Sequence, residues 1–225
     1  MPLPRPSSLT IAALVILGTA CSSDQTALRI GLAGPFGEAR GRSMRRAAEL
    51  AVQQINQAGG VRGRQIELVA LDDSGRAGRA VEVARQLTED PSIVAVVGHL
   101  TSGATLAAAP VYGGATPIPV ISPSASSPTL SDASPWIFRV CPTDLRHGAA
   151  LAAWARDQLH AGRAAVFYLN DEYGRGVRDV FVAEFRERGG EIIANDPSPN
   201  TTKSGKPIAR CTSMNSPMRR TTISL

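Results

Sequence analysis

Two neighbouring stretches decide the fold, and they read IVAVVGHLTSG at positions 93–103 and IPVISPSASS at positions 118–127. Each stretch begins with an apolar run, and each run leads into a cluster of small hydroxyl residues. A continuous apolar run of this length predicts a strand that is buried on both faces, as in a parallel sheet. Because ligands of open parallel sheets bind outside the carboxyl ends of the strands, the two hydroxyl clusters are the predicted binding loops.

The rest of the chain alternates between strand and helix patterns. Further strands are expected at residues 27–33, 66–72, 136–140, 164–169 and 191–194. Apolar residues recur at helical spacing within residues 44–55, 80–87, 102–109, 144–154 and 177–185, and Asp144 is the expected cap of the fourth of these helices. Repetition of strand, helix and strand specifies a parallel sheet covered on both sides. We therefore predict an α/β fold, with a doubly wound parallel sheet in residues 27–141 and an incomplete second α/β lobe in residues 142–196.

Charge argues against nucleic acid as a partner. The net charge of the chain is +5, but residues 1–196 hold 19 arginines and 19 acidic residues, so that part is neutral. The excess lies wholly in the last stretch, which leaves no basic stripe on the body to bind phosphates. The first lysine appears only at Lys203, and residues 197–225 are rich in Ser, Thr, Pro and Lys. This change of composition predicts either a disordered tail or an aberrant end from a shifted reading frame or a truncated gene.

The first 21 residues have the pattern of a secretory signal. A positive start at Arg5 precedes an apolar core, and the small residues Gly18-Thr19-Ala20 precede Cys21. The apolar core is too short to span a membrane. The end of the segment is similar to a bacterial lipoprotein cleavage site, which predicts that Cys21 carries lipid and that residues 22–26 form a linker. The alternative is a plain signal peptide cleaved near Ala20. Either way, we expect an exported protein.

Other motifs in the sequence do not support a catalytic, nucleotide-binding or metal-binding site. The stretch GLAGPFG at 31–37 departs from the dinucleotide-binding spacing, and Pro35 removes a backbone N–H that a pyrophosphate would need. The hydroxyl clusters hold no G-x-S-x-G motif, and the three histidines have no evident place in a triad, so they are expected at the surface or in loops. Trp136 and Trp154 are expected in the core. Cys141 and Cys211 give no disulfide framework, and we expect no disulfide, metal or cofactor in the body.

These motifs together resemble the periplasmic Leu/Ile/Val-binding protein family. The matching motifs are GHLTS at 98–102, ISPSASSP at 121–128, FR at 138–139 and YGRG at 173–176, with NQAGGVRG at 56–63 and DD at 72–73. The resemblance covers about residues 27–196. It implies a type I periplasmic binding fold, in which two lobes close on an amino acid or similar small molecule and an ABC permease receives it.

The resemblance also implies the site residues. By position, Ser102 would donate to the ligand carboxylate, and Ser124, Ala125 and Ser126 would complete the contacts of the first lobe. Tyr173, in a loop expected at residues 170–176, would contribute from the second lobe, unless it covers the start of a helix that Asp171 caps. The hydroxyls suit this role because they can donate to a carboxylate or accept from an ammonium group. The family is longer than this chain, and its acidic ammonium-binding residue is expected beyond residue 225.

We predict a substrate-binding protein of an ABC importer, held at the membrane by its lipid anchor in the periplasm or at the cell surface. An alternative is a sensor or regulator that uses the same fold, and another is a truncated fragment without function. An α/β enzyme is disfavoured because no catalytic constellation is visible.

Overall fold

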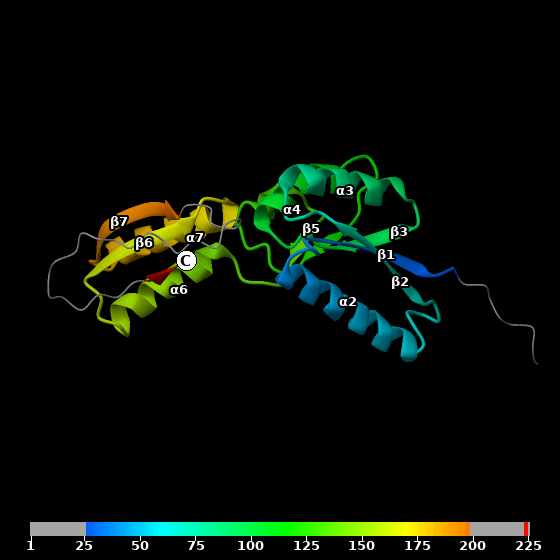
Figure 1. Ribbon diagram of the computed structural model, residues 1–225, viewed down its shortest axis with the longest axis horizontal. Helices are drawn as coiled ribbons and strands as arrows, with labels where there is room; N and C mark the ends of the chain where they lie inside the picture. Colours follow the sequence, from blue (N-terminus) through cyan, green and yellow to red (C-terminus); the bar gives the residue numbers. More distant parts are fainter. Residues whose placement is uncertain (1–25, 199–222, 225) are drawn as a thin grey trace, which may run out of the picture.

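The computed structural model describes residues 26–198 and 223–224, which form two parallel sheets. The first sheet contains β1 (Leu28–Gly34), β2 (Ile66–Asp72), β3 (Ile93–Val97), β4 (Val120–Ser122) and β5 (Ile137–Arg139). The second contains β6 (Arg163–Leu169), β7 (Glu191–Ser198) and β8 (Ile223–Ser224). The two sheets, each with its own helices, lie side by side along the longest axis of the molecule (Figure 1). The predicted α/β class is confirmed.

The first sheet has the strand order β2-β1-β3-β4-β5. All neighbouring strands run parallel, with Leu32 of β1 opposite Ala70 of β2 and Val97 of β3. The order reverses at β1, because β2 lies on one side of it and all later strands lie on the other. A reversal of this kind opens a crevice at the carboxyl ends of the two strands that flank it, and ligands bind there.

Helices cover both faces of the first sheet. They are α2 (Ala39–Gln57), α3 (Ala77–Glu89), α4 (Ser102–Tyr112) and the short α5 (Leu130–Ala133). Figure 1 shows α3 and α4 on one face and α2 on the other. The helix α3 packs against the first sheet because its apolar residues recur every three or four positions. This spacing places Ala80, Val83, Ala84 and Leu87 on one buried stripe. Gly59 and Gly60, both with positive φ, follow the end of α2.

The prediction that the two deciding strands are buried on both faces is wrong. Val94 of β3 and Ile121 of β4 are exposed, as is Phe138 of the edge strand β5. The reason is that α2 packs over β1 and β2, while α3 and α4 cover the opposite face. On the side of the sheet where α2 packs, the described residues therefore leave the face of β4 and β5 largely uncovered. The strand β4 is also shorter than the apolar run that predicted it, because it begins at Val120 rather than at Ile118.

The two tryptophans are not core residues. Trp136 is 37% exposed and Trp154 is 50% exposed, so the prediction that both are buried is wrong. Trp136 immediately precedes the edge strand β5. Trp154 lies on α6 (Asp144–Asp157), between the buried residues Ala152 and Ala155, and so points away from the stripe that these alanines form.

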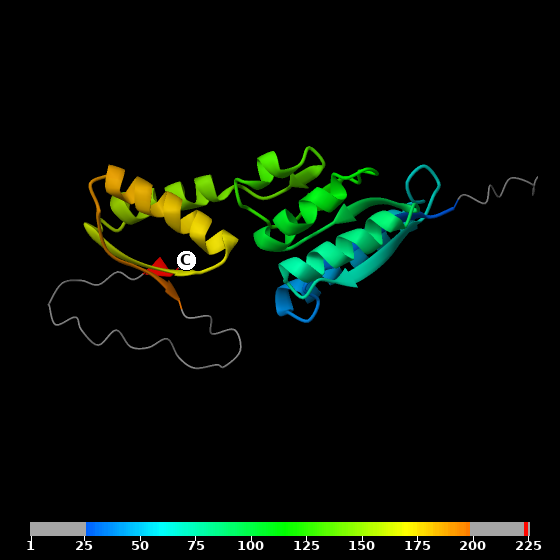
Figure 2. The same ribbon diagram turned by 90° about the horizontal axis from the view of Figure 1, so that it is seen from above.

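The second sheet is packed against α6 and α7 (Glu172–Glu187), which lie on the same side of it (Figure 2). Its core joins small residues of α6 and β6 to Phe181 and Phe185 of α7, whose rings stack at a centroid distance of 5.4 Å. Residues 140–143 connect the first sheet to α6. None of the described helices is long and apolar enough to cross a membrane.

Candidate functional site

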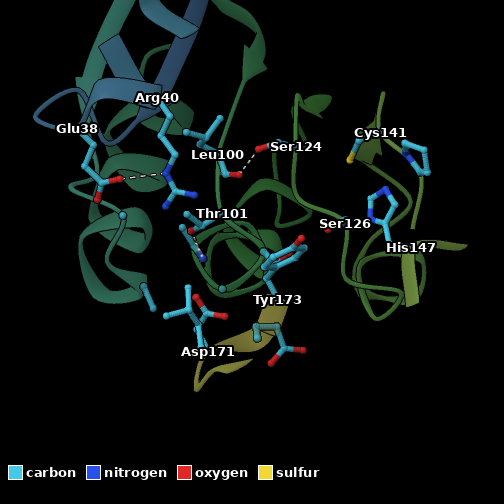
Figure 3. A pocket seen from close by; sticks show the side chains of 18 residues that line it. Glu38, Arg40, Leu100, Thr101, Ser124, Ser126, Cys141, His147, Asp171 and Tyr173 are labelled. Carbon is cyan, nitrogen blue, oxygen red and sulfur yellow. Dashed lines mark hydrogen bonds and ion pairs between the residues drawn. The ribbon is translucent and has the colours of Figure 1, made fainter. Parts of the chain in front are cut away.

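A cleft of about 610 Å³ lies between the two parts of the molecule, at the carboxyl ends of the strands (Figure 3). Each wall segment directly follows a strand of the first sheet or β6. The lining residues are Glu38, Arg40, Gly75, Ala77, Leu100 to Ala104, Ser124, Ser126, Cys141, Pro142, His147, Leu169 and Asp171 to Tyr173. Four of the five predicted ligand residues are among them, namely Ser102, Ser124, Ser126 and Tyr173. Parallel strands bring these loops together because all their carboxyl ends lie at one edge.

The loop after β3 leads directly into the N-terminus of α4. Thr101 caps this helix, since its Oγ1 accepts a hydrogen bond from the Ala104 N–H at 3.3 Å. Ser102 is the first helical residue, and its buried Oγ accepts from the Ser127 N–H at 3.3 Å. The N–H groups of Ser102 and Gly103 lie in the first turn, where a helix offers them no acceptor. This end of α4 therefore presents N–H groups and a hydroxyl to an anionic group.

The loop after β4 is tied to the β3 loop by its hydroxyls. Ser124 donates from its Oγ to the Leu100 carbonyl at 2.6 Å, and Ser122 donates to the His99 carbonyl at 2.6 Å. Ala125 is fully buried and does not line the cleft, and its N–H donates to the Ser122 Oγ at 3.0 Å. The Ser126 Oγ is buried and has no hydrogen-bond partner among the described residues.

His99 lies in the loop after β3, within the expectation that the histidines occupy the surface or loops, but it is fully buried. Its Nδ1 lies 2.6 Å from the Asp73 Oδ2 and its Nε2 lies 3.1 Å from the Tyr112 hydroxyl, with all three residues inaccessible to solvent. The network joins the end of β2, the β3 loop and the end of α4. Together with Gly98, where a Cβ would come within 2.3 Å of the Ala33 carbonyl oxygen, it fixes the backbone that carries Ser102.

Residues 172–176 belong to a helix, not to the predicted loop, because α7 begins at Glu172. Asp171 caps α7 by accepting from the Gly174 N–H at 2.8 Å, as the alternative interpretation predicted. Tyr173 lies in the first turn of α7 and still lines the cleft (Figure 3). Burial raises the pKa of the Tyr173 hydroxyl, and the negative charges of Asp144 and Asp171 add to this effect.

Asp144 is the most unusual residue near the cleft. It was predicted to cap α6, but the cap is Thr143 and Asp144 is the first helical residue. Its side chain is fully buried and neither carboxylate oxygen forms a hydrogen bond with the described residues. The Nδ1 of His147, one turn later and in the cleft wall, lies 3.7 Å from its Oδ1. Burial raises the pKa of the Asp144 carboxyl, a shift that hydrogen-bond donors and positive charge nearby oppose only in part.

Charges around the cleft are mostly negative. Glu38, Asp171 and Glu172 line it, against the single cation Arg40, which pairs with Glu38 at 3.0 Å. No cluster of three metal-type ligands occurs among the described residues, and Cys141 in the cleft wall is a free cysteine. The predicted lipidation site Cys21 and most of the predicted tail lie outside the described residues.

A family model described as periplasmic binding protein matches residues 27–211, most of the chain. The chain therefore belongs to the periplasmic binding protein family. Among its relatives, the amino acid binding protein of Pseudomonas aeruginosa is 33% identical over 186 residues, which are 81% of this chain and 49% of that protein. The Leu/Ile/Val-binding protein homolog 1 of Brucella abortus is 29% identical over 185 residues, with the same coverage. The resemblance seen in the sequence is confirmed.

Solved structures give the same result. The branched-chain amino acid transporter substrate binding protein of Streptococcus pneumoniae, solved in complex with isoleucine, superposes with a TM-score of 0.69 and 30% identity. The match covers 76% of this chain and 49% of that one. The chain thus has the fold of substrate-binding proteins of ABC transporters, and it spans about half the length of the relatives it matches.

Proposed function

We propose that this protein binds an amino acid of the branched-chain type, or a similar small molecule, in the cleft between its two lobes, as the extracytoplasmic receptor of an ABC importer. The observation that carries the proposal is the cleft wall at the N-terminus of α4. There the Ser102 hydroxyl and the first-turn N–H groups converge where the relatives' fold would hold a ligand. These groups suit the carboxylate of an amino acid, since donors at a helix N-terminus favour negative charge.

The function is binding rather than catalysis. The cleft holds hydroxyls, peptide groups and carboxylates, and the Nδ1 of its His147 lies 3.7 Å from the buried carboxylate of Asp144. The names of the relatives describe binding proteins and support the same view. Export follows from the signal-like residues 1–21, and anchoring through Cys21 is part of the proposal. Mass spectrometry of the membrane fraction tests the anchor, which an unmodified mature chain would contradict.

The binding test is a titration of the full chain with L-leucine, followed by NMR shifts of its backbone amides. We expect saturable shifts with a Kd in the millimolar range, about −4 kcal/mol, because the first lobe supplies most of the polar groups that line the cleft. Ser102→Ala removes one donor to a charged group and should weaken binding about tenfold. Ser43→Ala is the control, since Ser43 is exposed on α2 and away from the cleft.

Two results would count against the proposal. Shifts that rise linearly without saturation would show that leucine does not bind specifically. Equal affinities of Ser102→Ala and the unmodified chain would show that the carboxylate is held elsewhere.

A further inference from the structure

One face of the first sheet is apolar and, among the described residues, uncovered on β4 and β5. A row of directly paired residues crosses the sheet from Leu32 of β1 through Val97 and Ile121 to Phe138 of β5. Leu32 is inaccessible to solvent, whereas Ile121 is 43% and Phe138 is 52% exposed. Exposure rises along the row because α2 packs on β1 and β2, at the other edge of this face (Figure 1).

The same face of β5 is apolar beyond Phe138. The ladder extends past both ends of this strand, since the Val120 N–H donates to the Trp136 carbonyl at 2.9 Å and the Val140 N–H donates to the Ser122 carbonyl at 3.3 Å. Side chains alternate along a strand, so Trp136, Phe138 and Val140 share one face. Trp136 is half-buried at its edge, and Val140 is 74% exposed.

We call this surface the open face. It consists of Val97, Pro119, Ile121, Pro123, Trp136, Phe138 and Val140. None of these residues carries a charge. Arg139, the charged residue of β5, points to the opposite face, where it donates to the Ser127 carbonyl and the Ser131 hydroxyl.

The helix α2 borders the open face with an apolar flank. The side chain of Asn56 bonds to both backbone groups of Ile66, which fixes the side of α2 that is turned toward β2. Ala47 and Ala51 lie roughly half a turn around the helix from Asn56, so they are on the side turned toward the open face. Both are exposed, as is Ile55, one turn after Ala51. The α2 flank is therefore apolar and free of cover among the described residues.

We propose that a second copy of this chain covers the open face, in a two-fold symmetric dimer formed by the first sheets. Two packed sheets lie about 10 Å apart, and a helix is about 10–12 Å thick. The sheet of the partner therefore fits on the open face while α2 stands beside the partner's edge strand. Two-fold symmetry repeats this contact in the other direction, so each α2 flank meets one edge. The open face is uncharged, which suits contact with itself and offers nothing to a charged partner.

The exposed apolar area matches what such a dimer needs. The residues that contribute most are Leu50, Ile55, Ile121, Trp136, Phe138 and Val140. Their exposed parts amount to roughly 500 Å², if a fully exposed side chain of this kind presents about 150–200 Å². A standard interface buries about 800 Å² per partner, of which about 65% is apolar in homodimers, again roughly 500 Å². The proposal is independent of the proposed function, because the cleft lies at the carboxyl edge of the sheet and not on its face.

Analytical ultracentrifugation of the full chain, from low micromolar to submillimolar concentration, tests the dimer. We expect a monomer–dimer equilibrium with a Kd of about 10–100 μM, since interfaces of this size and without charged pairs lie at the weak end of the range. At the low micromolar concentrations of circular dichroism the chain is then largely monomeric and the open face is bare.

Two variants with matched exposure locate the interface. Phe138→Glu introduces a carboxylate on the open face, and Trp154→Glu introduces one on α6 of the second lobe, at side chains that are 52% and 50% exposed. Phe138→Glu should weaken the dimer at least about a hundredfold, because symmetry places an unpaired charge in the interface twice. Trp154→Glu should leave the Kd unchanged.

A second readout needs no charged substitution. The chain has two tryptophans, so Trp154→Phe leaves Trp136 of the open face as the only one. Dilution through the Kd should shift its fluorescence to longer wavelength, because dissociation returns Trp136 to water. In Trp136→Phe, where Trp154 is the reporter, dilution should cause no shift.

Three results would overturn the proposal. A chain that sediments as a monomer at every concentration shows that no second copy binds, whether the open face is bare or another segment of the same chain covers it. A dimer that Phe138→Glu leaves intact, or one in which Trp154 rather than Trp136 changes its emission, has its interface elsewhere.

Discussion

At the scale of single residues, the two buried acids near the site are in opposite situations. Asp73 is held by the ring of His99 and by the Gly75 N–H, at 2.6 and 2.7 Å, so both of its carboxyl oxygens have partners. Asp144 has no such hydrogen bonds, and burial raises its pKa. The groups that face Asp144 from neighbouring elements are His147 on its own helix, Arg139 on β5 and Tyr173 on α7.

The raised pKa of Asp144 predicts a pH-dependent stability. The folded state holds this proton more tightly than the unfolded chain, where the pKa of an aspartate is about 3.9. The contribution of this proton to folding stability is therefore lost as the pH rises above about 4. The loss of this contribution is complete once the pH exceeds the pKa of Asp144 in the folded state. Asp144→Asn should unfold at higher denaturant concentration than the unmodified chain at pH 7, and this difference should shrink toward pH 4. A constant difference across that range would contradict the raised pKa.

At the scale of elements, burial differs sharply between the two parts of the molecule. Phe181 of α7 is 1% exposed and stacks on Phe185 in the second core. Phe138 of β5 is 52% exposed, on the face of the first sheet that α2 leaves open. Phenylalanine is therefore a core residue in the second part of the molecule and a surface residue on the first sheet.

This contrast predicts two different stability effects for one substitution. Phe181→Ala should lower the free energy of unfolding by about 3–5 kcal/mol, because it removes a buried ring and leaves a cavity. Phe138→Ala should change it by less than about 1 kcal/mol, since little of its surface is removed from water in this chain. Urea denaturation followed by circular dichroism measures both. A large loss for Phe138→Ala would show that another segment covers this face.

At the scale of the whole molecule, the lobes are unequal. The first sheet has five strands and the second has three among the described residues, and the chain spans about half the length of the relatives it matches. Most of the polar groups in the cleft come from the first lobe, and the second lobe contributes His147 from α6, Asp171 from the cap of α7, and Glu172 and Tyr173 from its first turn. A ligand held mostly from one side makes fewer contacts to offset the entropic cost of association.

This inequality predicts that a longer second lobe strengthens binding. A chimera that continues from β7 into the remaining half of the Pseudomonas aeruginosa amino acid binding protein should bind leucine at least about a hundredfold more tightly than this chain, given two further hydrogen bonds to charged groups. Calorimetry on both proteins is the measurement. Micromolar binding by the 225-residue chain itself would contradict the argument.

The order of strands and helices was predictable from the sequence, because apolar spacing follows the local geometry of each element. The same pattern predicted that the hydroxyl loops gather at one edge, since parallel strands all end there. The sequence did not predict the exposure of Trp136 and Trp154, the burial of His99 or the full burial of the Asp144 carboxyl group. Those properties depend on which elements cover a residue and on which donors reach it, and only the packing of the two lobes decides that. For Asp144, residues distant in the sequence, Ser126 and Gly176, lie close to its carboxylate, and no local pattern records such a neighbourhood.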